Sequence, residues 1–232
     1  EELKERFPDW NIARLDADAV SRVGSLEETL ESFRTGHVDL LVGTQMVAKG
    51  LNFPGVKTIG VVLADAGLNL PDFRASERVF SLIVQVAGRA GRYDSSGAVY
   101  LQTYRPESQV IRKAAAMDTE GFYAQELAML QAQGVPPFSR LARIVVRAKE
   151  KTPCGSGAGL LTHQLDARRI PGLEILGPSE CPLSLVAGTY RWQILLKADS
   201  LSPLRQALAG LELSALPSSA RVELDVDPVQ LL

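Results

Sequence analysis

The segment of the chain best suited to chemistry is Gln85-Val-Ala-Gly-Arg-Ala-Gly-Arg92. It places Arg89 and Arg92 three positions apart, a spacing at which two helical side chains are neighbours and can reach the same polyanion. Arginine suits phosphate because its planar guanidinium forms paired hydrogen bonds and stays charged when water is excluded. Gly88 and Gly91 remove side-chain bulk, which would let a nucleotide or a facing domain approach the backbone. The spacing therefore predicts a site for a phosphate-bearing ligand.

A helix C-terminus offers a simpler interpretation of part of this segment. The helix dipole favours basic side chains there, and a glycine commonly follows the last turn. That interpretation accounts for Gly91 and Arg92 but leaves the complete Gln-x-x-Gly-Arg-x-Gly-Arg spacing unexplained. We therefore favour the functional interpretation.

The elements that must position this segment alternate between short apolar runs and amphipathic stretches. The run Ser25-Leu-Glu-Glu28 has the form of a capping box at the start of a helix. Strands that alternate with helices indicate βαβ units, so the sequence predicts a parallel sheet. The expected strands are residues 12–15, 38–42, 59–64 and 98–103, and the expected helices are residues 25–34 and about 73–87.

The pattern changes after Gly134, because two consecutive prolines, Pro136 and Pro137, prevent the helical stretch at 111–133 from continuing. The order of elements that follows is β-α-β-β-α-β, which is that of a split βαβ, ferredoxin-like domain. The glycine-rich stretch at 155–159 is expected to be a flexible turn. The expected strands are 141–148, one or two within 173–185, 190–198 and 221–226, and the expected helices are 158–169 and 202–213.

Composition excludes several classes of protein. Hydrophobic residues make up 46% of the 232 residues and charged residues 22%, which is typical of a globular chain of one or two domains. No apolar run approaches the roughly 18 to 20 residues that span a bilayer, so no membrane association is expected. The 25 basic and 27 acidic residues give a net charge of −2, so any grip on nucleic acid must come from local geometry.

No metal site is expected within the chain. Cys154 and Cys181 form no CxxC pair and are interpreted as two unrelated thiols, and His37 and His163 are far apart in sequence. Turns at strand ends explain the closely spaced carboxylates better than a metal or an acid/base pair does. These carboxylates are Asp16 with Asp18, and Asp225 with Asp227.

The segments described above resemble those of the superfamily 2 helicases. Gln85–Arg92 resembles motif VI of that superfamily, and Val42–Pro54 resembles motif V at the expected distance upstream. The wording of Gly67–Arg78 is more specific and resembles the replication-restart helicases, the primosomal protein N′ family. Arg191–Leu196 and Leu224–Pro228 are similar to the end of the same proteins, so the resemblance covers nearly the whole chain.

The resemblance implies an α/β motor of two RecA-like lobes that hydrolyses ATP to move 3′ to 5′ along DNA. Residues 1–105 would form the second lobe, 106–135 a helical connector, and 136–232 the smaller α+β, ferredoxin-like C-terminal domain. The implied partners are forked and single-stranded DNA, single-stranded DNA-binding protein and the primosome proteins that restart replication at stalled forks. The implied location is the cytoplasm, in association with the nucleoid.

ATP and Mg²⁺ are held in such motors by a phosphate loop with a Gly-Lys dipeptide, and the 232 residues contain no such dipeptide. The nucleotide site is therefore expected to lie mostly outside the chain, and the chain alone is expected to be inactive. The family's zinc-binding cysteines are expected only upstream of residue 1. The chain begins without Met inside an expected helix, which favours a piece of a longer protein.

By this resemblance, Arg92 is the candidate arginine finger that reaches the γ-phosphate of ATP across the interface between the lobes, with Arg89 beside it. Such a residue stabilises the charge that develops during phosphoryl transfer. Gln85 would couple that site to its surroundings through its amide. Gly88 would leave space for the nucleotide.

Motif V supplies further candidate contacts. Just past a strand end, loop N–H groups and a hydroxyl can hold a DNA phosphate without reading its sequence. Gly50 suits a tight turn beside the nucleotide. Asn52 is a candidate nucleotide contact where related helicases often carry Asp, so it keeps the hydrogen-bonding shape but loses the charge. The implied DNA contacts are Gly43, Thr44, Gln45 and Lys49, and Lys49 is equally well explained as a solvated surface lysine.

Alternation along the strand at 190–198 predicts two faces. One face, with Tyr190, Trp192, Ile194 and Leu196, is expected in the core. The other is a mixed polar face on which Arg191 and Gln193 are the candidate DNA contacts, beside Leu195 and Lys197. Arg143 and Arg147, at alternate positions of an earlier strand, could add positive charge to one surface. A solvated sheet face remains the alternative.

Two other functions remain open at this point. The chain could be a non-catalytic DNA-binding or scaffold module with a degenerate helicase lobe. It could also belong to another superfamily 2 translocase that acts on recombination intermediates. A phosphate-loop lysine and an acidic Walker B box in the preceding sequence would favour the motor.

Overall fold

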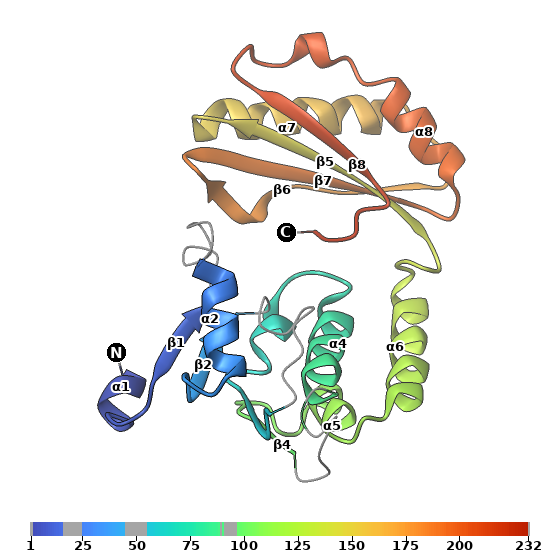
Figure 1. Ribbon diagram of the computed structural model, residues 1–232. Helices are drawn as coiled ribbons and strands as arrows, with labels where there is room; N and C mark the ends of the chain where they lie inside the picture. Colours follow the sequence, from blue (N-terminus) through green and yellow to red (C-terminus); the bar gives the residue numbers. More distant parts are fainter. Residues whose placement is uncertain (1, 16–24, 45–54, 89, 91–96, 232) are drawn as a thin grey trace. The chain divides into compact units, whose positions relative to one another are not determined.

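The structure, a computed structural model, describes residues 2–15, 25–44, 55–88, 90 and 97–231 of the chain (Figure 1). These residues group into two compact units. The first unit takes in the chain up to residue 66 together with 78–119, and the second, called the C-terminal unit below, takes in 67–77 and the chain from 120 onward. None of the described helices combines the length and apolarity needed to cross a bilayer.

The first unit is built on two pairs of parallel strands. β1 (Ile12–Leu15) lies beside β2 (Leu40–Gly43), with Leu15 opposite Gly43. β3 (Thr58–Val61) lies beside β4 (Ala98–Leu101) in the same parallel sense. The parallel pairing predicted from the strand and helix alternation is therefore confirmed, although the described ladders form two separate pairs rather than one sheet.

The two helices predicted at 25–34 and about 73–87 are confirmed as α2 (Ser25–Arg34) and α4 (Ala75–Ala87). α1 (Glu2–Arg6) precedes β1, α2 precedes β2, and the single turn η2 (Ala66–Asn69) follows β3. α4 begins in the C-terminal unit and continues in the first, and α5 (Gln109–Ala115) follows β4. α4 buries a stripe at helical spacing, which is what a core-facing amphipathic helix requires. This stripe consists of Val79, Phe80, Ile83 and Val86.

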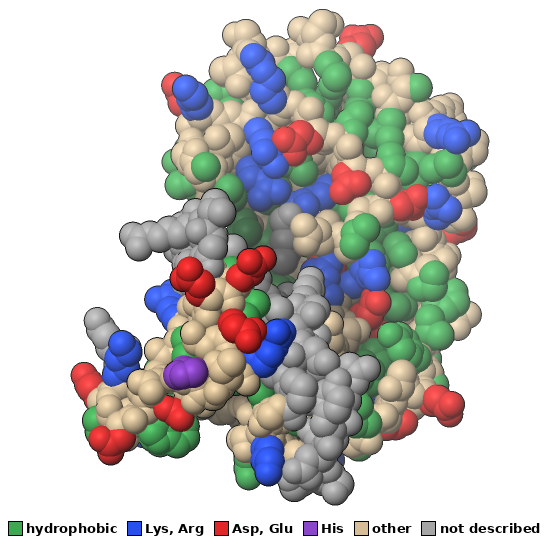
Figure 2. All heavy atoms as spheres, viewed as in Figure 1, with side chains coloured by type: hydrophobic (Ala, Val, Ile, Leu, Met, Phe, Trp, Pro, Cys, Tyr) green, Lys and Arg blue, Asp and Glu red, His purple; other side chains and the backbone are tan. Residues whose placement is uncertain are grey.

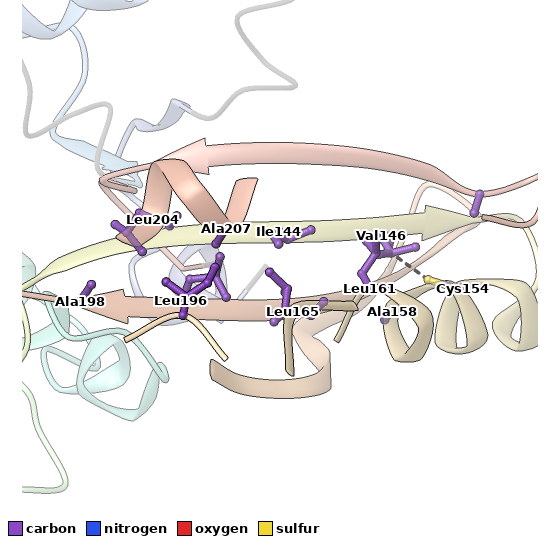
Figure 3. Packing of buried hydrophobic residues seen from close by; sticks show 14 of the residues in the cluster. Ile144, Val146, Cys154, Ala158, Leu161, Leu165, Leu196, Ala198, Leu204 and Ala207 are labelled. Atoms are coloured by element: carbon purple, nitrogen blue, oxygen red, sulfur yellow. Dashed lines mark hydrogen bonds between the residues drawn. The ribbon is translucent and has the colours of Figure 1, made fainter. Parts of the chain in front are cut away.

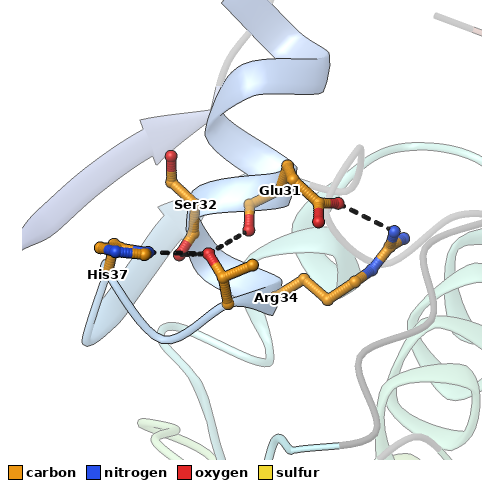
Figure 4. Close-up of polar contacts among 5 residues, drawn as sticks. Glu31, Ser32, Arg34 and His37 are labelled. Carbon is orange, nitrogen blue, oxygen red and sulfur yellow. Dashed lines mark hydrogen bonds and ion pairs between the residues drawn. The ribbon is translucent and has the colours of Figure 1, made fainter.

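A Schellman motif ends α2 and turns the chain toward β2. Figure 4 shows the polar contacts of Glu31, Ser32, Arg34 and His37 around this turn. The N–H of His37 donates to the carbonyl of Ser32 at 2.9 Å, and Gly36 adopts a φ of 79°, the left-handed conformation that such a cap needs. The hydroxyl of Thr35 lies 2.8 Å from Nδ1 of His37. The His37 side chain therefore contributes to the turn that follows α2.

The C-terminal unit contains α6 (Thr119–Gln133) and a four-stranded antiparallel sheet with the strand order β6-β7-β5-β8. Along the chain its elements alternate as β-α-β-β-α-β, as predicted. After α6 the elements are β5 (Arg140–Ala148), α7 (Lys151–Ala167), β6 (Leu173–Val186), β7 (Thr189–Ala198), α8 (Leu201–Ala209), the single turn η3 (Leu213–Ala215) and β8 (Arg221–Val226).

The core of this unit lies between one face of the sheet and helices α7 and α8 (Figures 1 and 3). Ile144 and Leu196 come from adjacent strands, and Leu161 and Leu204 from the two helices; all four are completely buried. Burying each such side chain contributes roughly 1.5 to 3 kcal/mol of transfer free energy. The other face of the sheet carries the alternate residues of each strand and is called the open face below, because neither α7 nor α8 covers it.

The glycine-rich stretch at 155–159 is helical, so the prediction of a flexible turn there was wrong: α7 begins at Lys151, with Pro153 in its first turn where proline is tolerated. Tertiary packing accounts for the glycines. A Cβ on Gly155 would come within 3.2 Å of the Trp192 ring, and one on Gly157 within 3.3 Å of Val146. The glycines let α7 lie close to the sheet.

Candidate functional site

The carboxyl ends of β1 and β2 place the first candidate DNA contacts. Gly43 is the last residue of β2 and Thr44 follows it directly, and both are exposed. Because the two strands are parallel, their carboxyl ends meet at one edge, which is where ligands bind in open α/β sheets. The exposed Thr44 hydroxyl and neighbouring N–H groups suit a phosphate that is bound without sequence readout.

Six of the candidate site residues lie outside the residues that the structure describes, so their predicted roles stay predictions. They are Gln45, Lys49, Gly50 and Asn52 of the motif V segment, and Arg89 and Arg92 of the motif VI segment.

The C-terminal end of α4 leads into the motif VI segment. The buried stripe of α4 leaves Gln85 exposed, two positions before the helix ends at Ala87. The N–H of Gly88 still donates to the carbonyl of Val84 at 2.9 Å, so the last turn closes there. A Cβ on Gly88 would meet no described atom closer than 3.4 Å. Packing among the described residues therefore does not demand a glycine, and the predicted role of Gly88 stays a prediction.

In the C-terminal unit, the two predicted faces of the strand at 190–198 are confirmed. Ile194 and Leu196 are fully buried against the helices, and Tyr190 and Trp192 pack on the same cluster. Arg191 lies on the open face but is only 9% exposed, so it is not a solvated surface residue.

Gln193 is engaged within the open face. Nε of Arg143 donates to Oε1 of Gln193 at 2.9 Å, and Nη2 of Arg143 lies 3.6 Å from Sγ of Cys181. Arg143 is itself almost completely buried. The pair joins β5 to β7, so the described contacts of Gln193 are those of a residue that braces the sheet.

Sequence reasoning missed Arg221, which the strand register places beside the predicted arginines. Arg147 of β5 is opposite Arg191 of β7 on one side and opposite Arg221 of β8 on the other. Nη2 of Arg147 lies 2.8 Å from Oε2 of Glu223. The alternation of residues 221–226 could have placed Arg221 on a face, but only the pairing of β8 with β5 brings it next to Arg147.

Other charged side chains around the sheet form ion pairs. Arg140 pairs with Asp227 through two hydrogen bonds, and Lys197 lies 2.6 Å from Glu174. Asp227 has a φ of 54° and precedes Pro228, so it sits in a turn after β8, as the sequence predicted. Among the described residues, no group of three or more His, Cys, Asp and Glu side chains is arranged to hold a metal ion.

A cavity of about 370 Å³ lies within the C-terminal unit, where α6, the segment before α4 and the turn after β8 meet. Arg74 and Glu77 line it, and the Arg74 guanidinium donates two hydrogen bonds to the Glu77 carboxylate, at 2.8 and 2.9 Å. Glu126 of α6 is buried in its lining, and Oε1 of its carboxyl has no hydrogen-bond partner. Burial raises the pKa of Glu126, and the negative charge of Glu77 adds to that effect.

Comparison with known proteins accounts for both units. Residues 1–94 match the family described as Helicase conserved C-terminal domain, and residues 131–229 match the Primosomal protein N C-terminal domain. The whole chain is 46% identical to the replication restart protein PriA of Treponema pallidum and 39% identical to that of Haemophilus influenzae. A match to the PriA protein of Bacillus subtilis is 41% identical over 85% of the chain.

The chain spans about a third of the length of these relatives, 35% of the Treponema protein and 32% of the Haemophilus protein. The identities over the complete chain and the two domain matches in the expected order agree on one family. The chain belongs to the family of the replication restart protein PriA.

Proposed function

We propose that the chain forms the second motor lobe and the C-terminal domain of an ATP-dependent 3′–5′ DNA helicase that restarts replication at stalled forks. The match of residues 1–94 to the helicase C-terminal domain carries this proposal. In this arrangement residues 1–105 are the second RecA-like lobe, 106–135 a helical connector and 136–232 a ferredoxin-like domain. The parallel strand pairs of the first unit and the sheet order β6-β7-β5-β8 support these two folds.

The motor works by closing and opening a cleft between two lobes. ATP bound to the first lobe would contact Arg92 and Arg89 of this chain, and Arg92 would stabilise the charge that develops on the transferred phosphoryl group. Gln85, in the last turn of α4, would couple that contact to its surroundings through its amide, and Gly88, Gly50 and Asn52 would line the nucleotide. The 232 residues hold no phosphate loop for Mg²⁺, so the chain alone is proposed to be inactive.

Closure would change the grip of this lobe on one DNA strand. Gly43 and Thr44, at the end of β2, would hold a backbone phosphate together with Gln45 and Lys49. Alternate gripping and release would move the protein along DNA. Single-stranded DNA-binding protein and primosome proteins are the proposed partners, and the cytoplasm is the proposed location.

ATP hydrolysis by the full-length protein, stimulated by forked DNA, tests this proposal. Arg92→Ala is expected to lower kcat by roughly 10³-fold or more, as the loss of an arginine finger does, with a smaller change in DNA affinity. Arg78→Ala, in α4 but one turn after its start, is the matched control. Full turnover in Arg92→Ala would contradict the arginine-finger role. A full-length protein that binds DNA but hydrolyses no ATP would instead favour a non-catalytic scaffold.

A further inference from the structure

Three arginines form a row across the open face of the C-terminal sheet, called the arginine row below. Arg191 on β7, Arg147 on β5 and Arg221 on β8 are direct cross-strand neighbours. Residues opposite each other in an antiparallel ladder project on the same side of the sheet, with Cβ atoms about 5 Å apart. Like charges at this spacing destabilise a sheet. A negative charge beside the row would offset this repulsion.

The described acidic side chains supply too little of it. Glu223 is the acid paired with the row, 2.8 Å from Arg147, which leaves three cations facing one anion. Arg221 donates to the backbone carbonyls of Ser218 and Ala220, which carry no charge. Figure 2 shows Lys and Arg side chains gathered over β5, β7 and β8, with only a few acidic side chains among them.

Two guanidinium groups of the row also have donors without acceptors. Nε of Arg191 and Nε of Arg147 are buried and have no hydrogen-bond partner. Arginine cannot lose its proton in a protein, so a buried guanidinium must find an acceptor or lose free energy. Arg191 is 9% exposed, so water can supply little of what is missing. These donors point to a ligand that brings acceptor oxygens.

Unpaired charge is not a general property of this sheet. Arg140 pairs with Asp227, Lys197 with Glu174 and Lys151 with Glu180. Arg143 lies four positions before Arg147 on β5, so it projects on the same face as the row. It has Gln193 and Cys181 as partners. The row stands apart because both the charge and the hydrogen bonds of its members are incompletely satisfied.

We propose that Arg191, Arg147 and Arg221 bind a backbone phosphate of the DNA on which the motor acts. The proposal rests on the proposed function, because it identifies how the C-terminal domain holds that DNA. A phosphate fits the row because its oxygens accept hydrogen bonds in several directions and guanidinium groups bind them in pairs. Contact of this kind is independent of base sequence.

Equilibrium binding of a labelled DNA fork to the full-length protein, without nucleotide and over a range of salt concentrations, tests the site. Arg191→Met keeps the length of the side chain and removes the charge. We expect a several-fold loss of affinity and a decrease of about one in the slope of log K against log salt, which signals one lost phosphate contact. Arg205→Met, an equal loss of charge at an exposed position of α8, is expected to leave the slope unchanged.

Thermal unfolding of each variant accompanies the binding measurements. Because Nε of Arg191 has no partner to lose, Arg191→Met is expected to fold at least as stably as the parent. If it does not fold, Arg221→Met at the exposed end of the row decides the question by the same salt series. Arg191→Lys should keep part of the affinity, because the charge remains while the paired geometry is lost.

Parent-like affinity and salt dependence in Arg191→Met and Arg221→Met would overturn the arginine row as a phosphate site while leaving the proposed function intact. A parent protein that binds no DNA would overturn both. If Arg191→Met binds DNA like the parent but has lost affinity for an acidic peptide, the row takes a carboxylate partner instead and the proposal is wrong.

Discussion

Asp72 and Leu231 are joined by a hydrogen bond between positions 159 residues apart, in which the backbone N–H of Leu231 donates to Oδ2 of Asp72 at 2.8 Å. Oδ1 of the same carboxylate accepts from the N–H of Arg74 at 2.9 Å. Both Asp72 and Leu231 are buried. One side chain thus orders the start of α4 and holds the C-terminal tail of the chain.

Asp72→Ala is expected to lower the stability of the C-terminal unit by about 1 to 3 kcal/mol, because two backbone donors lose their acceptor. Asp72→Asn is the control, since its amide oxygen can replace one of the two contacts and should lose less. Urea unfolding followed by tryptophan fluorescence measures both. An unfolding midpoint for Asp72→Ala equal to that of the parent would show that the tail is held by other contacts.

Glu126→Gln is expected to stabilise the protein at neutral pH. The folded-state pKa of Glu126 is raised by burial, so the carboxyl is easier to ionise in the unfolded chain. The parent therefore loses stability as the pH rises from the ordinary Glu pKa, about 4.3, through the raised folded value. The variant lacks this loss. Unfolding midpoints measured from pH 4 to about pH 8 should diverge with rising pH, and parallel curves would contradict the assignment.

The lowered pKa of Asp65 predicts the opposite dependence of stability on pH. Burial opposes its ionisation, but hydrogen bonds from the side chain of Thr103 and the N–H of Tyr104 outweigh burial and lower its pKa. The ionised Asp65 carboxylate stabilises the folded state above the ordinary Asp pKa of about 3.9. This stabilisation is lost as the pH falls through the lowered pKa of the folded state. Asp65→Asn should therefore be less stable than the parent at pH 7, with the difference shrinking in acid. A difference that grows in acid would rule this out.

Two alanine substitutions in α7 separate packing from helix propensity. Gly157→Ala puts a methyl group 3.3 Å from Cγ1 of the fully buried Val146, which cannot move aside, and a net loss of about 1 kcal/mol is expected. Gly159→Ala meets nothing within 4 Å and should gain roughly 0.5 to 1 kcal/mol from the better helix former. Thermal unfolding gives both values, and equal effects at the two positions would refute the packing explanation.

Sequence pattern predicted most of the elements because their signals are local. The apolar alternation at Tyr190–Ala198 and the apolar run of β2 are local patterns that predict a strand without reference to the rest of the chain. β8 begins and ends where its own pattern indicated. The start of α7 was missed because glycine disfavours helix in isolation. The Trp192 ring that packs against Gly155 is 37 positions away in sequence, so the local pattern around Gly155 could not indicate this contact.

The candidate site was predictable to a smaller degree. Arg191 was singled out by its parity, but its burial depends on the packing of neighbouring strands. Arg221 became part of the site only through the register of β8 against β5. Glu126 carried no signal at all, because a single Glu in a helix is ordinary until the surrounding chain removes its water.

The two cysteines give each face of the C-terminal sheet its own chemical reporter. Cys154 is fully buried on the helix side, where its thiol donates to the carbonyl of Val146, and burial raises its pKa. Cys181 is buried on the open face beside Arg143. A thiol-specific alkylating reagent can then modify Cys154 only when α7 lifts from the sheet, and Cys181 only when the side chains packed around it on the open face separate. The order in which the two sites are alkylated would time the opening of the two faces separately in a single unlabelled protein.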